Sequence, residues 1–483
     1  LSFTISAIFS LVFKSKKPIY LTMLLLLSAA ILNTIIIKKP ALKKNEKEFS
    51  HPTVVQNLQK MIKHETIKSN IDLNDQVREA YMNELKQLFP TVFKEMELRL
   101  VSRSFLLHYK YETDPQKPFL IMCHSDVVDA TGDWTNPPFS GVVKDNKIYG
   151  RGTFDTKGSL CAMLQAAEDL FSQKKLTRSF YIFSSFDEET THVGAPEVVE
   201  YFKKENIILD FVLDEGGAII DPPFPGLKHR CAMIALAEKG QMTIKFTATS
   251  NGGHSSQPPR ITPLSTLAKL VLVTPKMFTN RVHPITLQTF KSIAPYMKFP
   301  LRFILGNGWL FKPLVKLVLL INSTSAAMLR TTNVFTIAQA GTEFNVVPRE
   351  ASMVANFRFG LHQDYNESKC LMEKVCKKLN VKMDVISGCK NSKIATTGEK
   401  YKFLTKTIDK VFGDVIITPY FALGGTDARF FGDVCDNVYR FIPLSVSTDQ
   451  LLRMHGIDEN IDVSTLMQAV EFYKEIILGQ NKQ

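Results

Sequence analysis

Five short motifs that contain histidine, aspartate or glutamate lie far apart in this 483-residue chain. An apolar run leads into each motif and stops where the imidazole or carboxylate begins. Buried parallel strands end in this way, and the carboxyl ends of such strands meet at one edge of a sheet. We therefore expect the motifs to converge on one site. The candidate ligands, one from each motif, are His124, Asp155, Glu189, Asp214 and His455.

Nitrogen and oxygen donors without thiolates suit zinc, manganese or cobalt, and a bridging carboxylate can hold two such ions about 3.5–4 Å apart. The sequence therefore predicts a hydrolase with two metal ions. Asp126 lies two residues after His124, where it is placed to orient that imidazole and raise its basicity. The adjacent Glu188 and Glu189 favour a division of labour, in which one binds metal and the other handles the proton of the metal-bound water.

Each carboxylate taken alone has a simpler interpretation, because a single Asp or Glu more often caps a helix or lies in a solvated turn. The order of the motifs after apolar runs makes metal binding the better interpretation of the set. Two further stretches accompany them, Gly150-Arg151-Gly152 before Asp155 and Gly424-Gly425-Thr426-Asp427 near the far end.

The elements that must position these residues follow from the hydrophobic pattern. Short apolar runs alternate with helical periods between residues 118 and 213, which predicts an α/β fold with a mostly parallel sheet covered by helices on both faces. Strict alternation at 242–246 and 353–359 is typical of half-exposed antiparallel strands. The α/β pattern resumes after Gly360, so we expect an inserted domain. The predicted divisions are 1–50 (hydrophobic anchor and basic linker), 51–237 (catalytic domain, first part), 238–360 (inserted α+β lid) and 361–483 (catalytic domain, second part).

Residues 263–330 are apolar and interrupted by proline, which predicts helices that line a cleft or cover another apolar surface. The part from residue 301 to 320 would suit an acyl chain that enters from one side. Packing against the catalytic core is an equally good interpretation, since apolar helical stretches are usually core.

The N-terminal region contains an uncharged run of nineteen residues, 19–37, with lysines on both sides and a second apolar stretch, 1–13, before it. The run is long enough to cross a bilayer. We expect a retained transmembrane helix with a lumenal or extracellular catalytic domain. The alternative is a cleaved signal peptide and a secreted enzyme, although the run exceeds the usual apolar length of such peptides, about 7–15 residues. Lysines at both ends leave the orientation open.

Composition argues against three other classes of protein: nucleic-acid-binding, thiolate-zinc and disulfide-rich proteins. The formal net charge is +12, but eight lysines and two glutamates among residues 1–50 contribute +6 of it. The remainder has no stripe of basic residues with interleaved aromatics, so no nucleic-acid partner is expected. Seven cysteines without CxxC spacing argue against a thiolate zinc site and against a dense disulfide framework.

The motifs together resemble one known family, the co-catalytic zinc hydrolases that include aminoacylase, carboxypeptidase G and carboxypeptidase S. Within it, the long insert and the segment before the last histidine look most like carboxypeptidase S and the secreted N-fatty-acyl-amino-acid synthase/hydrolase. Thr156 departs from the family pattern, which often has a second Asp there. The stretches that carry the resemblance are HSDVV, YGRGTFDTKG, DEET, VLDEGG, GGHSS, FNVVPREASMVANFR, GGTDARFF and MHGIDENI.

The resemblance implies a role for each site residue. Two Zn²⁺, or Co²⁺ or Mn²⁺ in their place, would share Asp155 as the bridging ligand, with His124 and Asp214 on one ion and Glu189 and His455 on the other. Glu188 would be the general base, with Asp126 orienting His124. In the lid, His254 resembles the oxyanion stabiliser. The residues that resemble holders of the substrate carboxylate are Asn345, Arg358, Gly425 and Thr426.

The expected reaction is hydrolysis, or reversible formation, of the amide bond of an N-acyl amino acid by a metal-bound hydroxide. A metallocarboxypeptidase or dipeptidase acting on short peptides would use the same machinery. A membrane-tethered binding protein on an inactive hydrolase scaffold is a third reading, which the intact set of ligands and Glu188 opposes. The lid would be mobile and of the kind that forms homodimers.

Overall fold

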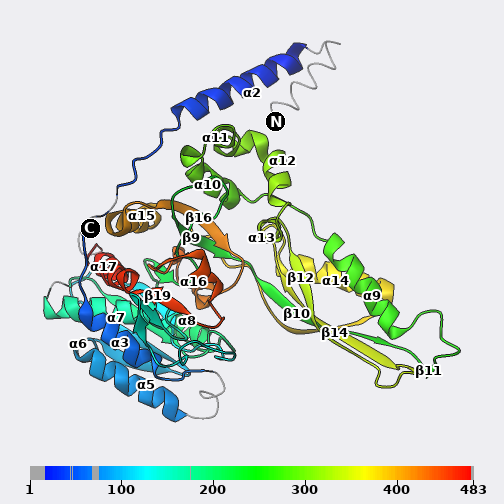
Figure 1. Ribbon diagram of the computed structural model, residues 1–483, viewed down its shortest axis with the longest axis horizontal. Helices are drawn as coiled ribbons and strands as arrows, with labels where there is room; N and C mark the ends of the chain where they lie inside the picture. The colour runs from blue at the N-terminus through cyan, green and yellow to red at the C-terminus, as the bar shows by residue number, and fades with distance from the viewer. Residues whose placement is uncertain (1–16, 44, 46, 68–74, 175, 480–483) are drawn as a thin grey trace.

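The structure is a computed structural model that describes residues 17–43, 45, 47–67, 75–174 and 176–479. The expected apolar stretch at residues 1–13 lies outside this description. Figure 1 shows a main domain built on one large sheet, an elongated lid built on a smaller sheet, and a long N-terminal helix above both.

The large sheet has ten strands in the order β1-β2-β6-β3-β7-β17-β9-β8-β18, with β16 paired to β9. Strand β3 pairs in parallel with β6 and β7, and β7 pairs in parallel with β17. Antiparallel pairs lie at the β1-β2-β6 end and at β8-β9. The sheet is therefore mixed and mostly parallel, which confirms the prediction. The strands are β1 (Glu97–Val101), β2 (Ser104–Tyr109), β3 (Phe119–His124), β6 (Phe180–Ser185), β7 (Val212–Asp214), β8 (Ile219–Ile220), β9 (Cys231–Glu238), β16 (Ile416–Ala422), β17 (Val438–Arg440) and β18 (Ser445–Val446).

Helices cover both faces of this sheet, as predicted. Every residue of β3 is buried, and its side chains alternate between two cores. Phe119, Ile121 and Cys123 join the core under α7 and α17, whereas Leu120 and Met122 join the core under α8. On the first face lie α3 (Pro52–Ile62), α5 (Asp75–Leu88), α6 (Pro90–Glu95), α7 (Lys157–Ser172), α15 (Glu399–Phe412) and α17 (Val463–Gly479), and on the second lie α8 (Gly194–Lys204) and η3 (Asp427–Asp433).

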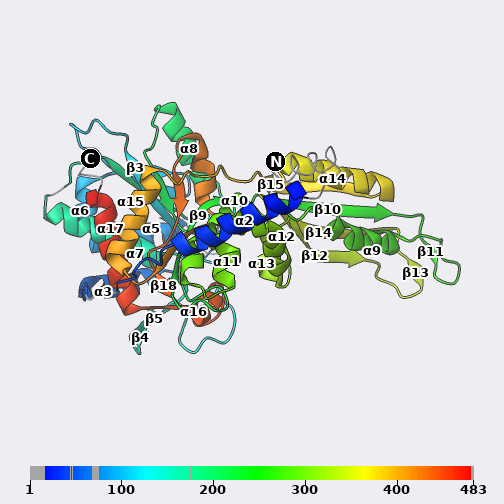
Figure 2. The same cartoon turned by 90° about the horizontal axis from the view of Figure 1, so that it is seen from above.

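The lid is a four-stranded antiparallel sheet in the order β12-β14-β10-β15. Side chains of β10 alternate between buried and half-buried, which confirms the half-exposed strands expected from the sequence. Two helices cover the buried face, and a short ribbon forms the tip farthest from the main domain (Figures 1 and 2). The elements are β10 (Gln241–Thr249), β12 (Thr332–Ala340), β14 (Glu350–Arg358), β15 (Lys382–Cys389), α9 (Pro263–Val273), η1 (Thr274–Lys276), α14 (Tyr365–Leu379) and, in the ribbon, β11 (Gly253–His254) and β13 (Val346–Val347).

Two features of the insert differ from the sequence-based prediction. The lid continues past residue 360, because β15 pairs with β10 and α14 packs on the same sheet. A helix followed by a strand has the same sequence pattern in a lid as in an α/β domain, so the pattern could not locate this boundary. In addition, α10 packs on β16 of the main domain, where Thr289 donates a 2.6 Å hydrogen bond to the Pro419 carbonyl. The helices of this segment are α10 (Pro284–Ile293), η2 (Ala294–Tyr296), α11 (Leu301–Gly306), α12 (Gly308–Leu319) and α13 (Ser323–Ala327).

The N-terminal helix α2 (Lys17–Ile36) contains the predicted apolar run. Among the described residues it is the helix long and apolar enough to cross a membrane, and most of its side chains from residue 19 onward are exposed, whereas Ala30 is buried and Asn33 and Thr34 are half-buried. It contacts α11 of the insert.

Candidate metal centre

The predicted ligands lie at the carboxyl edge of the large sheet. His124 is the last residue of β3, Asp214 is the last residue of β7, and Glu189 follows β6. Because these three strands are parallel neighbours, their carboxyl ends are adjacent. Asp155 lies in the turn before α7, and His455 follows α16 (Thr448–Leu452), near the end of the chain.

One carboxylate joins two clusters at this edge. Asp155 Oδ1 lies 3.0 Å from His124 Nε2, and Asp155 Oδ2 lies 2.8 Å from His455 Nε2. His455 Nε2 also lies 3.0 Å from Glu189 Oε1. Each of the two clusters, with Asp155 shared between them, has its donor atoms within 4.8 Å of one another. This arrangement suits a carboxylate that bridges two metal ions.

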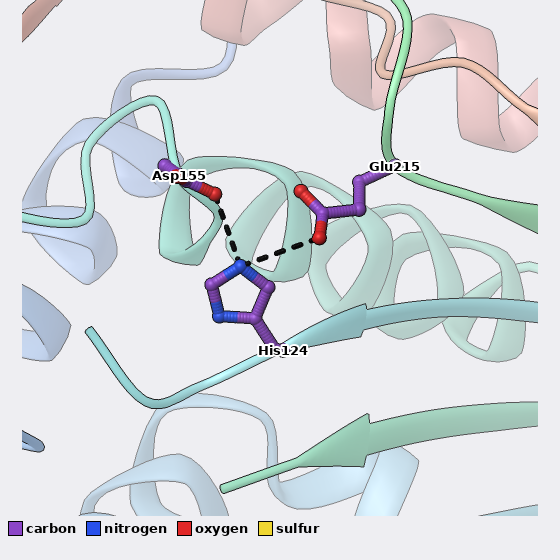
Figure 3. Close-up of side chains that lie close together, drawn as sticks. All are labelled: His124, Asp155 and Glu215. Carbon is purple, nitrogen blue, oxygen red and sulfur yellow. Dashed lines mark hydrogen bonds and ion pairs between the residues drawn. The ribbon is translucent and has the colours of Figure 1, made fainter. Parts of the chain in front are cut away.

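The third member of the His124 cluster is Glu215 and not the predicted Asp214. Glu215 Oε1 lies 3.5 Å from His124 Nε2, and Figure 3 shows its carboxylate directed at the imidazole beside Asp155. The Asp214 carboxylate instead accepts a 2.9 Å hydrogen bond from the backbone N–H of Ala428. Consecutive side chains at the end of a strand point in different directions, so only one of these two neighbours can face Asp155. We therefore assign Glu215 to the metal centre in place of Asp214.

Asp126 supports the centre in a different way from the one expected. Its backbone carbonyl, and not its carboxylate, accepts a 2.8 Å hydrogen bond from His124 Nδ1, which leaves Nε2 as the free donor for a metal. Its carboxylate is 3.6 Å from that nitrogen. The same carboxylate accepts hydrogen bonds from the backbone N–H groups of Glu188, at 3.2 Å, and Glu189, at 3.0 Å. Asp126 thus fixes both the imidazole and the pair of glutamates.

The charges of this site explain why cations would bind there. Burial raises the pKa of Glu188 and of Glu215 well above the usual range, and neighbouring carboxylates add to the effect. Burial would also raise the pKa of Asp155, but hydrogen bonds with His124 and His455 outweigh it and lower that pKa. Hydrogen bonds with Asp155 and Glu189 raise the pKa of His455 to about 10. Zinc ions would replace the imidazole protons and balance the excess of carboxylates, so the donor set fits them.

A buried ion pair that sequence reasoning did not single out holds the Asp155 turn. Glu459 Oε1 accepts hydrogen bonds from the backbone N–H groups of Gly152, Phe154 and Asp155 at 2.9–3.2 Å. Glu459 Oε2 lies 2.7 Å from a guanidinium nitrogen of Arg151, and both side chains are almost fully buried. The available signal was the position of each residue inside a quoted motif, Arg151 in YGRGTFDTKG and Glu459 in MHGIDENI.

A cavity of about 440 Å³ opens directly onto the two clusters. Asp155, Glu188, Glu189, Glu215 and His455 form its polar side. The rest of its wall is mainly apolar, with Ala218, Ile220, Met233, Leu423, Ile442 and Met454 among the lining residues. The segment 301–320, considered from the sequence as a place for an acyl chain, contributes none of the lining residues.

The predicted substrate-binding residues lie in three places. Gly425 and Thr426 line the cavity, but Thr426 donates both its backbone N–H and its hydroxyl to Glu238, at 3.1 and 2.7 Å. Arg358 ends β14 at the base of the lid and donates a 3.2 Å hydrogen bond to Asn356.

His254 and Asn345 lie at the tip of the lid, where the backbone N–H of Ser255 donates a 2.9 Å hydrogen bond to the Asn345 carbonyl. His254 is exposed and lies 2.7 Å from the hydroxyl of Ser256. The tip is distant from the main domain (Figure 2), so this structure does not bring His254 or Asn345 to the metal centre.

Comparison with known proteins decides the family. The model of peptidase family M20/M25/M40 matches residues 120–479, a range that includes both clusters. This chain belongs to peptidase family M20.

Several M20 relatives match most of the chain. It is 36% identical over 410 residues to probable carboxypeptidase S-like 2 of Dictyostelium discoideum, covering 82% of this chain and 78% of that one. It is 35% identical over 415 residues to the N-fatty-acyl-amino acid synthase/hydrolase PM20D1 of Homo sapiens, covering 81% and 80%. The fold is similar to the M20 family metallo-carboxypeptidase Sso-CP2 of Sulfolobus solfataricus, with a TM-score of 0.63, 19% identity and coverage of 88% and 98%. The chain is therefore a metallohydrolase, as the sequence predicted.

The assignment of Glu215 leads to a test against its neighbour. Glu215→Gln removes a charged ligand and should reduce bound zinc from about two ions per chain to about one. Asp214→Asn keeps an oxygen that can accept the Ala428 hydrogen bond, so this matched control should bind zinc as the wild type does. Zinc is measured by mass spectrometry after dialysis. Loss of zinc in Asp214→Asn with retention in Glu215→Gln would restore the original assignment.

Proposed function

We propose that this M20 hydrolase uses two Zn²⁺ to cleave, or in reverse to form, the amide bond of N-acyl amino acids with long apolar acyl chains. The observation that supports this proposal most strongly is the apolar cavity beside the metal centre. The cavity has a volume of about 440 Å³ and is lined by Ile220, Met233 and Ile442. Each methylene group of a substrate that is buried there would make binding more favourable by about 0.8 kcal/mol. One relative named as an N-fatty-acyl-amino acid synthase/hydrolase is consistent with this substrate class.

Glu188 would act as the general base. Its side chain is buried and lines the cavity. Its carboxylate lies within 4.8 Å of the donor atoms of His124 and Glu189. Zinc bound here would acidify water and polarise the amide carbonyl. The water oxygen bonds to the carbonyl carbon as Glu188 takes one of its protons. Glu188 then gives this proton to the amide nitrogen as the C–N bond breaks.

The carboxylate of the amino-acid half would bind where positive charge exceeds negative charge. Burial lowers the pKa of Arg358, and the guanidinium of Arg429 lowers it further, so two cations lie near each other at the base of the lid. Glu238 lies 3.5 Å from Arg429. The carboxylate of Glu238 also forms a buried ion pair with Arg440, so it neutralises the charge of Arg429 only in part. We assign recognition of the substrate carboxylate to the guanidinium of Arg358 together with the backbone of Gly425.

His254 would stabilise the oxyanion only if a lid tip approaches the metal centre. Rotation of the lid could bring it there, and so could the lid of a second copy in a homodimer. Either movement would also deliver Asn345, which shares the tip.

The second candidate is a carboxypeptidase or dipeptidase, which the similarity to carboxypeptidase S-like 2 favours. In that enzyme the cavity would take the apolar side chain of a peptide. The third reading, an inactive scaffold, is opposed by the arrangement of both clusters and Glu188. For localisation we propose that α2 anchors the enzyme with its main domain outside the cytoplasm, and cleavage after α2 would release it.

Glu188→Gln tests the role of the base. The amide keeps the size of the side chain but cannot accept a proton, so kcat should fall by about 10² or more while two zinc ions stay bound. Glu189→Gln is the matched control, because the loss of a ligand should lower zinc content first. Turnover and zinc are measured on the same preparations. Zinc loss in Glu188→Gln with slow but zinc-loaded Glu189→Gln would mean that the two roles are exchanged.

A panel of N-acyl phenylalanines, from acetyl to oleoyl, tests the substrate class. The value of kcat/KM should rise with chain length by up to about fourfold per methylene until the cavity is full. Ala218→Leu narrows the cavity and should reduce cleavage of long acyl substrates while the acetyl substrate is cleaved as before. A flat response to chain length, together with rapid cleavage of ordinary dipeptides, would favour the carboxypeptidase.

A further inference from the structure

The helices α11 and α12 form a hairpin with a large exposed apolar face. This face lies outside the cavity, and the proposed function does not use it. The exposed fractions of its side chains include 53% for Trp309, 62% for Leu317 and 84% for Ile321. Phe299, Leu314 and Val318 are exposed beside them. A face of this kind in water marks a site of interaction with a protein or with lipid.

The hairpin is fastened to the C-terminal end of α2 by buried hydrogen bonds. Asn307, between α11 and α12, is fully buried. Its side-chain nitrogen donates to the Ala30 carbonyl at 3.0 Å and to the Thr34 hydroxyl at 2.9 Å. Its side-chain oxygen accepts from Asn33 at 2.8 Å. Such polar contacts hold helices together in an apolar medium, where unsatisfied groups are costly.

Arg302 adds a second attachment at the same end of α2. Its guanidinium donates hydrogen bonds to the carbonyls of Thr34 and Ile37. The last carbonyls of a helix have no partner within the helix, and a cation there also offsets the helix dipole. The contacts run from Ala30 to Ile37, which is about 10 Å along the helix axis. Interfacial helices enter a bilayer to a similar depth, about 5–10 Å.

The charge of the surrounding segment indicates which partner covers this face. Between Glu238 and Glu343 the sequence has no aspartate or glutamate and twelve lysines or arginines. On and beside the hairpin, Lys38, Lys39, Lys298 and Lys312 are exposed. An apolar face on a segment that carries cations and no acidic residue complements a membrane with anionic lipid headgroups, which attract basic side chains at the surface.

We propose that the α11–α12 hairpin is a lipid-binding element that lies in the surface of an anionic bilayer beside the end of α2. Hydrogen bonds of Asn307 and Arg302 hold the hairpin to the end of α2, and α2 lies beside α11 in Figure 1, so a bilayer that takes up α2 also reaches the hairpin. The hairpin then places its apolar side chains among the acyl chains and its lysines among the headgroups. This attachment sets the position of the main domain relative to the lipid surface.

Tryptophan fluorescence tests the proposal, because the chain has two tryptophans and Trp309 lies on the hairpin. The full chain is reconstituted into phosphatidylcholine vesicles that contain phosphatidylserine, with or without acyl chains brominated near the headgroup. The Trp309 signal is the difference between the wild type and Trp309→Phe. Bromolipid should quench this signal by roughly half or more, with little effect on Trp134 in the main domain. Quenching of Trp309 no greater than that of Trp134 would overturn the proposal.

Charged substitutions provide an independent check. Leu317→Glu combined with Val318→Glu places two charges on the exposed face without disturbing the core, and α2 keeps the variant in the vesicle. Quenching of Trp309 should fall to the level of Trp134. Leu272→Glu, at an exposed position on α9, is the matched control and should quench as the wild type does. Unchanged quenching in the double variant, or shielding of Trp309 from both bromolipid and aqueous acrylamide, would show that lipid does not cover this face.

Discussion

The contact of one carboxylate, Asp155, with two imidazoles from distant parts of the chain is the constraint on which the rest of the site depends. His124 comes from the middle of the large sheet, and His455 comes from a turn near the C-terminus. Both imidazoles must reach the same carboxylate. The parallel strands must therefore end at one edge of the large sheet, and the C-terminal segment must return to that edge. The ion pair of Arg151 and Glu459 secures the turn that carries Asp155. The site therefore concentrates carboxylates whose charge bound cations would balance, and burial of Glu188 beside them raises its affinity for a proton, as a base needs.

The sequence predicted those parts of the fold that depend on local pattern. Apolar runs such as 119–123 indicated buried strands, and the alternation at 242–246 indicated a sheet with one buried face. Four of the five predicted ligands lie together: His124 and Glu189 because a parallel sheet aligns its strand ends, and Asp155 and His455 because the turn before α7 and the turn after α16 reach the same edge. The choice between Asp214 and Glu215 could not be made from sequence, since it depends on how the chain turns after β7. The end of the lid was missed for a related reason, because α14 and β15 differ from α/β elements only in their tertiary partners.

Two apolar features link the chemistry to lipid. In the proposed function the cavity would receive the apolar part of a substrate at the metal centre, and the α11–α12 hairpin presents a separate apolar face beside α2. The cavity and the hairpin face lie on different segments, and the role of each is tested by a separate experiment. Together they describe an enzyme that would meet amphiphilic substrates at the surface where such molecules accumulate. The lid between them carries His254 at its tip and Arg358 at its base, so a lid movement would change the oxyanion site more than the carboxylate site.

The central claim is that Asp155 bridges two metal ions. X-ray absorption at the zinc edge tests it most directly, because backscattering from a second zinc reports the separation of the ions. The account predicts about two zinc ions per chain with a zinc–zinc distance of about 3.5–4 Å, and loss of that distance in Asp155→Asn. A fully active enzyme with one zinc ion per chain and no zinc–zinc scattering would contradict it.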